Sequence, residues 1–226
     1  MKHLIIIFLA FISFFSYSQE TKRHLIGAGF SPEACYRTMG GGEPVPNIDV
    51  FAFGFTAGFT YQYNIKWWVA IETGVFYSDK GSGVDFSGLG FGDQIDPRRG
   101  FIYNTGDNIY NKQKLNLVYL EIPVKFNFYF SKSKVKPFLG IGFLNNVFLM
   151  GGRNYTSYDR SSWLSPYNLQ GIVSMGIDFD FSKSITMRIE PQFKHSIISI
   201  WKDSGNNGEY PYSIGCMVGL YYRLEK

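Results

Sequence analysis

The sequence predicts an all-β protein, an eight-stranded antiparallel transmembrane β-barrel, and three observations support this. Aromatic residues make up 19% of the 226-residue chain, which also has 25 glycines, a composition typical of many strands separated by turns. Apolar side chains alternate with small or polar ones at period 2 over eight segments. Short and long connections alternate between these segments, as do the periplasmic turns and extracellular loops of outer-membrane barrels.

The predicted strands are long compared with the usual five or six residues, roughly, of globular strands. They span about 23–35, 51–63, 67–79, 115–130, 136–150, 167–181, 185–199 and 213–224. The short connections are 64–66, 131–135 and 182–184, and the long ones are 36–50, 80–114, 151–166 and 200–212. Pro123 and Pro191 each remove a backbone donor inside a strand, so we expect a bulge or a local gap there.

Alternation alone does not decide which face of the barrel points outward. In strand 185–199, for example, Ile189 lies on one face and its neighbours Arg188 and Glu190 lie on the other. A soluble lipocalin-like barrel would place the apolar face inside. The interior of eight strands is only just wide enough for side chains, too narrow for the many Phe and Tyr residues of the apolar face. That face therefore points outward, into lipid.

Aromatic residues gather near the short-turn end of the predicted strands. We expect them to form a belt at the level of the lipid headgroups. They are Tyr61, Tyr63, Trp67, Trp68, Phe128, Tyr129, Phe130, Phe138, Phe179, Phe181, Tyr221 and Tyr222.

Residues 1–18 have the three-part pattern of a secretory signal peptide. A short basic start precedes about 12 apolar residues and a small-residue run that ends at Ser18. The apolar run is shorter than the roughly 20 residues of a spanning helix, which disfavours the alternative of an uncleaved anchor. We therefore expect export to the cell outer membrane, with residues 19–226 forming the barrel domain and both termini in the periplasm.

Two segments resemble a known family. Residues 119–125 (YLEIPVK) resemble the "YLEIP" strand of the PorT-like outer-membrane β-barrel proteins of Bacteroidota. The strands from Glu190-Pro191 to Arg223 are similar to the closing hairpin of that family. The resemblance implies an eight-stranded outer-membrane barrel. The namesake of the family is associated with a dedicated protein-secretion pathway, so the resemblance also allows a link to secretion, although most members have no assigned activity.

The strand parity places charged side chains inside the barrel. Because an unpaired ion is costly in a narrow interior, we expect these groups to form a salt-bridge network that plugs the lumen. A small gated pore is the alternative, but eight strands leave little room for one. The predicted lumen charges are Glu72, Glu121, Lys125, Asp178, Asp180, Arg188, Glu190, Lys194 and Arg223.

The sequence offers one weak candidate for a catalytic set. Lipid A deacylases are barrels of this size with His, Ser and Glu near the outer rim, and here His195, Ser196, Ser199 and Glu209 fall near that rim. However, the adjacent residues 195 and 196 point to opposite faces of a strand. Ile197 occupies the position where such a family carries its Ser. We therefore expect no catalytic residues and no enzyme activity.

No metal, cofactor or nucleic-acid site is predicted. His24 and His195 lack ligand partners at the spacing of a zinc site, and glycines 40–42 precede a proline-containing loop instead of a helix. A formal charge of +4 is too weak an excess to indicate nucleic-acid binding. The longest loop has four aspartates without the spacing of a calcium loop: Asp85, Asp93, Asp96 and Asp107.

The expected role is therefore non-enzymatic, in envelope structure or as a subunit or partner of an outer-membrane assembly. Lipid would contact the barrel wall, and a protein partner would bind through loops 80–114 and 151–166. A small pore and a lipid A-modifying hydrolase remain the alternatives.

The two cysteines form a candidate disulfide across the seam between the first and last strands. Cys35 and Cys216 both lie near the loop ends of strands that closure makes neighbours, and export permits disulfides. Two free thiols are the alternative, because Cys216 falls on the apolar face. A register slip of one residue would also place the pair on opposite faces.

Overall fold

The computed structural model describes residues 24–39, 49–50, 52–85, 112–152, 164–201 and 208–224. The predicted signal peptide 1–18 lies outside these ranges. So do the middle of loop 80–114, with Asp93, Asp96 and Asp107, most of loop 151–166, and glycines 40–42.

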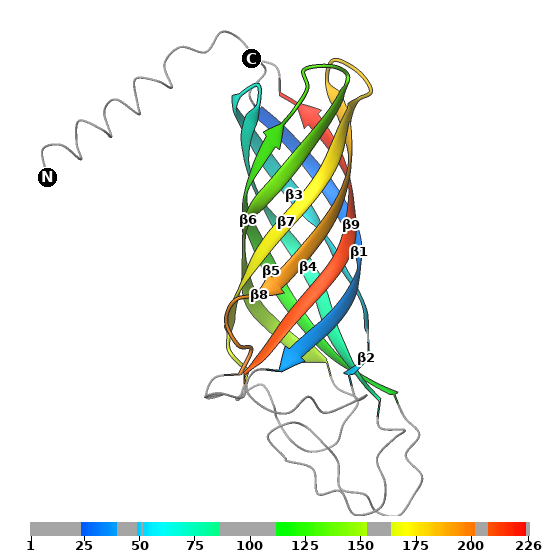
Figure 1. Cartoon of the computed structure of the whole chain (residues 1–226), viewed down its shortest axis with the longest axis vertical. Helices are drawn as coiled ribbons and strands as arrows, with labels where there is room; N and C mark the ends of the chain where they lie inside the picture. Colours follow the sequence, from blue (N-terminus) through cyan, green and yellow to red (C-terminus); the bar gives the residue numbers. More distant parts are fainter. Residues whose placement is uncertain are drawn as a thin grey trace, which may run out of the picture.

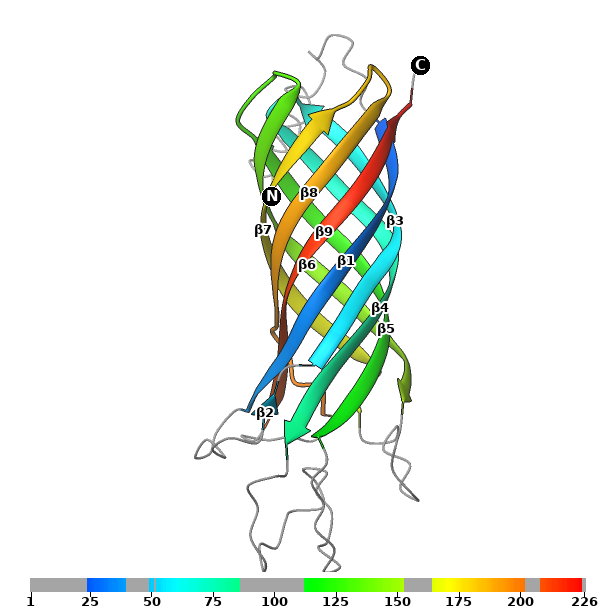
Figure 2. The ribbon, with the colours of Figure 1, turned by 90° about the vertical axis from the view of Figure 1, so that its right-hand side faces the viewer.

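Eight long strands form a closed antiparallel barrel, which confirms the predicted fold class (Figures 1 and 2). Each long strand pairs with its neighbours in the chain, and β1 pairs with β9 to complete the ring. The short β2 pairs with the loop end of β4 outside this ring. Within the described ranges, no helix is long and apolar enough to cross a membrane. The strands are β1 (His24–Met39), β2 (Asp49–Val50), β3 (Ala52–Lys66), β4 (Val69–Asp85), β5 (Lys112–Tyr129), β6 (Val135–Gly152), β7 (Tyr167–Asp180), β8 (Ile185–Ser196) and β9 (Glu209–Arg223).

The strands differ from their predicted bounds mainly at the loop end. β4 and β5 continue to pair from Lys80 opposite Leu117 out to Asp85 opposite Lys112. The residues 80–83 carry no apolar alternation, so the period-2 signal stopped at residue 79 although the backbone ladder continues. Pairing with a neighbouring strand extends β4 where side-chain pattern does not.

Apolar side chains cover the outside of the barrel and polar ones fill the inside. Phe59 is 74% exposed, and Phe53 and Met175 are exposed in the same way. Along β8, exposed and buried residues alternate without interruption. The outward apolar face that the volume argument predicts is therefore present.

Three of the twelve aromatics predicted for the short-turn belt face the lumen instead, and for these the prediction was wrong. Tyr129, Phe138 and Tyr221 are buried on the inward parity of their strands. Glycines make room for these rings, because a Cβ at Gly176 would lie 2.5 Å from the Phe138 ring. The position of an aromatic residue along a strand predicts its depth in the membrane. Whether its side chain faces lipid or the lumen depends on the alternation of the strand.

Pro123 and Pro191 each lie next to a gap in a strand ladder, without a register shift. The β4–β5 ladder skips the pairs between Thr73–Val124 and Phe76–Glu121, next to Pro123. The β7–β8 ladder has a similar gap next to Pro191. Both prolines lack the backbone N–H that the ladder needs, as expected.

Candidate functional site

The interior of the barrel is the candidate site, and Arg188 organises its short-turn half. The guanidinium is fully buried and makes a two-point contact with Asp178, Nε to Oδ1 at 2.6 Å and Nη2 to Oδ2 at 2.8 Å. Nη1 also bonds a carboxylate oxygen of Glu72. The guanidinium carbon lies 4.6 Å from the Phe138 ring centroid and 4.4 Å from that of Tyr221. Ion pairing and ring stacking together fix the orientation of this group.

Neutral side chains take up the remaining donors of Arg188. Nη2 donates to Gln62 Oε1 at 2.8 Å and to the Tyr129 hydroxyl at 2.9 Å, and Nη1 donates to the Tyr221 hydroxyl at 3.1 Å. The Tyr129 hydroxyl in turn donates to Asp178 Oδ2 at 2.9 Å. The guanidinium therefore has an acceptor or an aromatic ring on every side.

Lys125 extends this group toward the middle of the lumen. Its Nζ lies 2.5 Å from Glu190 Oε1 and 3.1 Å from Glu72 Oε1. Glu72 thus joins the ammonium of Lys125 to the guanidinium of Arg188. We call Arg188, Asp178, Glu72, Lys125 and Glu190 the Arg188 cluster.

A second group of ion pairs fills the loop half of the lumen. Lys194 Nζ lies 2.6 Å from Glu33 Oε1 and 3.1 Å from Glu121 Oε1. The other oxygen of Glu121 lies 2.5 Å from Lys80 Nζ. We call Lys194, Glu33, Glu121 and Lys80 the Lys194 cluster.

Uncharged polar groups complete the Lys194 cluster. Lys80 also donates to Gln170 Oε1 at 2.8 Å and to Asn146 Oδ1 at 3.2 Å. Glu33 accepts hydrogen bonds from the hydroxyls of Thr56 and Ser213. All nine charged residues of the two clusters are buried, five carboxylates against four cations. So many buried ions are tolerable only because each one has opposite charges and hydrogen-bond partners.

Seven of the nine predicted lumen charges lie in these two clusters. Glu72, Lys125, Asp178, Arg188 and Glu190 belong to the Arg188 cluster, and Glu121 and Lys194 to the Lys194 cluster. The other two, Asp180 and Arg223, lie apart at the short-turn mouth, where Arg223 Nη2 is 2.9 Å from Asp180 Oδ1. Lys136 pairs with the other oxygen of Asp180 at 2.5 Å.

Sequence reasoning missed Glu33 and Lys80. Glu33 shares the inward parity of Leu25 and Ser31 along β1, so the strand pattern contained the signal that it faces the lumen. Lys80 was assigned to a loop because its strand was expected to end at residue 79. Its inward parity with Ser78 becomes visible only once β4 is extended.

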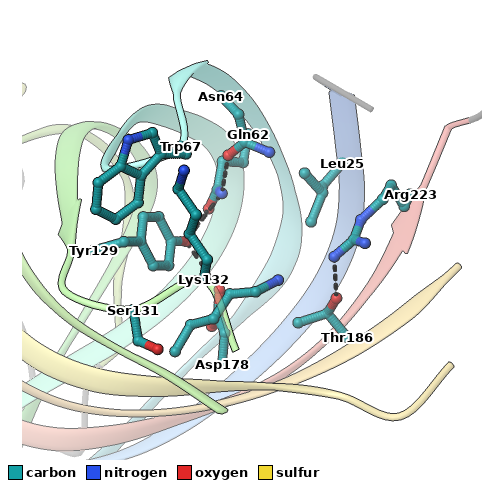
Figure 3. Close-up of a pocket in the computed structure, with 11 residues that line it drawn as sticks. Leu25, Gln62, Asn64, Trp67, Tyr129, Ser131, Lys132, Asp178, Thr186 and Arg223 are labelled. Atoms are coloured by element: carbon teal, nitrogen blue, oxygen red, sulfur yellow. Dashed lines mark hydrogen bonds between the residues drawn. The ribbon is translucent and has the colours of Figure 1, made fainter. Parts of the chain in front are cut away.

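A cavity of about 410 Å³ lies at the short-turn mouth of the barrel (Figure 3). Its inner end is formed by Gln62, Tyr129 and Asp178, the same residues that hold Arg188. Lys136 and Arg223 line it nearer the turns. The Arg188 cluster therefore forms the inner boundary of this vestibule.

An apolar cluster lies at the opposite, loop end. Leu117, Tyr119, Leu164 and Ile200 are buried together, with Phe148 and Trp201 packed against them. A bridge between Leu164 and Trp201 ties the described ends of two long loops together, and Ser165 N donates to Ile200 O at 2.7 Å. Two loops thus meet over this end of the strands.

The residues of the weak catalytic candidate do not come together. His195 is exposed on the outer face and stacks on Tyr212, with ring centroids 6.3 Å apart. Ser196 points inward, where its hydroxyl donates to Asn168 Oδ1 at 2.7 Å. The Ser199 hydroxyl oxygen accepts the backbone N–H of Glu209. In the described part of the chain, no three His, Cys, Asp or Glu side chains gather as metal ligands.

The cysteines do not form the candidate disulfide, and both are free. At the seam Cys35 pairs with Ser213, and Cys216 pairs across the other edge of β9 with Pro191. The register therefore separates them by three residues, about 10 Å along the strand. Cys35 also faces the lumen, whereas Cys216 has the outward parity of Ile214 and Val218. This register is the physical reason that the candidate pair is not bonded and that the alternative of two free thiols holds in this structure.

This chain is similar to solved structures of outer-membrane proteins. The crystal structure of OprG from Pseudomonas aeruginosa superposes with a TM-score of 0.52 at 13% identity, covering 90% of this chain and 97% of that one. Neisserial surface protein A gives a TM-score of 0.47 at 12% identity, covering 92% and 100% of the two chains. Outer membrane protein W of Escherichia coli gives 0.46 at 14%, also covering 92% and 100%.

A search of the curated proteins finds no significant match. The model of one family, the outer membrane protein beta-barrel domain, matches residues 27–202, most of the chain. The chain therefore belongs to the outer membrane protein beta-barrel domain family.

Proposed function

We propose that this protein is a non-conducting, non-enzymatic barrel of the outer membrane that acts in envelope structure or as a partner in an outer-membrane assembly. The observation that carries the proposal is the filled lumen. Two clusters of buried ion pairs occupy it along its length, and each charged group in them is bonded to an opposite charge.

The filled lumen argues against transport through the barrel. A hydrated ion would have to displace partners of Arg188 or Lys194, and leaving a buried charge uncompensated costs about 3–5 kcal/mol. The protein then acts through binding at the ends or on the outer wall of the barrel. The wall is apolar and fits lipid.

Ion conductance in planar bilayers tests this proposal. We expect no stepwise conductance from the wild-type protein, with a water-filled porin as the positive control. Steady conductance steps from the wild-type protein would favour the small pore and overturn the proposal.

For a partner, we propose contact through loops 80–114 and 151–166, the first of which is the longest connection in the chain. The PorT-like resemblance of residues 119–125 supports an assembly linked to protein secretion as the class of partner. Photo-crosslinking in cells from positions in these loops should give one stoichiometric adduct. The lipid-facing Ile189 is the control position, and equal adducts from both positions would contradict the loop contact.

The proposal includes export through residues 1–18. Mass spectrometry of the purified protein should then give an N-terminus at Gln19, with the protein in the outer-membrane fraction. A chain that retains residues 1–18 would contradict a cleaved signal peptide.

An intact lipid A profile in a His195→Ala strain, equal to wild type, would agree with the absence of hydrolase activity.

A further inference from the structure

The short-turn end of the barrel is strongly basic. The turns and adjoining strand ends 61–69, 129–138, 179–186 and 221–224 contain six Lys or Arg residues and one carboxylate, Asp180. The difference is a formal excess of five positive charges. Lys136 and Arg223 share Asp180. The four remaining residues, which we call the basic collar, are the exposed Lys66, Lys132, Lys134 and Lys183.

The collar lies directly beside exposed aromatic side chains. Trp67 and Trp68 follow Lys66 in the β3–β4 turn, and Phe130 and Phe181 occupy the same place in the other two turns. All three turns lie at one end of the barrel (Figure 2). Lys132 Nζ is 4.6 Å from the centroid of the Trp67 ring. Both side chains also line the vestibule at this mouth. Indole rings in membrane proteins sit at the level of the lipid headgroups, so this pair marks the headgroup level at the short-turn end of the barrel.

We propose that the basic collar binds the phosphodiester headgroups of anionic phospholipids in the leaflet that faces the short turns. In the half of the barrel next to these turns, no outward side chain of the described strands is Asp, Glu, Lys or Arg. One lipid molecule can therefore place its chains on the wall and its headgroup at the collar. A soluble anion would contact only the collar and not the apolar wall. Among the described residues, the collar lysines have no carboxylate partner that would compete with a lipid phosphate.

The expected effect follows from surface electrostatics. Each lysine near an anionic lipid surface contributes about a fivefold preference for the anionic lipid. The preference should weaken with salt, because exposed charges are screened beyond a Debye length of about 8 Å at physiological ionic strength. The proposal rests on the membrane location of the barrel and not on whether the lumen conducts.

The test is native mass spectrometry of the full chain purified with an equimolar mixture of phosphatidylglycerol and phosphatidylcholine of matched acyl chains. Lys132→Gln/Lys134→Gln removes two collar charges. Lys112→Gln/Lys114→Gln is the matched control, with the same spacing at the other end of the barrel in β5. Heat-modifiable gel migration checks that each variant is folded.

Wild type and the Lys112/Lys114 control should retain phosphatidylglycerol at least about fivefold over phosphatidylcholine. The preference of the Lys132/Lys134 variant should be at least about fivefold lower than that of the wild type, and Lys66 and Lys183 should account for what remains. Equal retention of both lipids by the wild type would overturn the proposal, as would an equal loss in the two variants. Displacement of the bound phosphatidylglycerol by free inorganic phosphate would also overturn it, because the site would then recognise the anion without the lipid.

Discussion

The two clusters inside the barrel both pair buried carboxylates with cations, but they use different cationic side chains. The guanidinium of Arg188 is planar and has five donors. It makes two hydrogen bonds to the carboxylate of Asp178 and is stacked between the rings of Phe138 and Tyr221. In the other half, Lys194 and Lys80 are flexible ammonium groups that share Glu121. In each cluster a second cation reaches the shared carboxylate, Lys125 at Glu72 and Lys80 at Glu121. The Arg188 cluster differs because it also depends on the planar, five-donor geometry of the guanidinium, which a lysine does not supply.

The largest expected effect is the loss of Arg188. Arg188→Ala leaves Asp178 and Glu72 without the guanidinium, and we expect the free energy of unfolding to fall by about 3–5 kcal/mol. Urea unfolding in lipid bilayers measures this change. Arg188→Lys keeps the charge but not the two-point hydrogen bonding of the guanidinium, so it should recover only part of the lost free energy of unfolding. Full recovery by Lys would show that geometry is unimportant here.

Loss of Lys194 should cost less. In Lys194→Met, Lys80 still pairs with Glu121, and Glu33 keeps its bonds from Thr56 and Ser213. We expect a loss of about 2–3 kcal/mol, since Lys194 bonds two carboxylates, those of Glu33 and Glu121, whereas loss of Arg188 also removes hydrogen bonds to three neutral side chains. The same urea titration compares the variants directly. A loss larger than that of Arg188→Ala would reverse the comparison between the clusters.

A smaller effect is expected from crowding the Arg188 cluster without removing a charge. In Gly176→Ala the new Cβ would lie 2.5 Å from the Phe138 ring on which Arg188 stacks. Overpacking of this kind typically costs about 1–3 kcal/mol. Gly171→Ala, where a Cβ would meet only Ile197 at 3.8 Å, is the control in the same strand and should be close to neutral.

The smallest effect is expected at the mouth. Asp180→Asn removes the partner of Lys136 and Arg223, but these side chains are partly in contact with solvent. We expect a change of about 1 kcal/mol or less in the same unfolding measurement, weaker at high salt. A cost equal to that of Arg188→Ala would mean that the mouth is as desolvated as the lumen.

The comparison also explains how much could be predicted from sequence. β7 and β8 alternate strictly, so parity alone placed Asp178, Arg188 and Glu190 inside the barrel. The Lys194 cluster was only half predicted, because Lys80 lies beyond the last apolar alternation of β4. Strand ends that form only by pairing with a neighbouring strand lack the apolar alternation from which strands are predicted.

Other features depend on contacts between distant strands, which a single sequence does not encode. The register between β1 and β9 separates Cys35 from Cys216, and a shift of even one residue changes which side chains face each other. Tyr129 and Tyr221 were expected in the headgroup belt, yet both hydroxyls bond Arg188 from strands far apart in the chain. The role of these rings follows from closure of the barrel.

Water exchange at the Arg188 side chain tests most directly the claim that bonded ion pairs fill the lumen. Side-chain nitrogen NMR of the protein in lipid nanodiscs, with Arg188→Lys to assign the signal, reports exchange of the guanidinium protons with water. We predict resolved guanidinium protons that exchange far more slowly than those of a free arginine. A single averaged signal exchanging at the rate of free arginine would mean a water-filled lumen and would contradict the account.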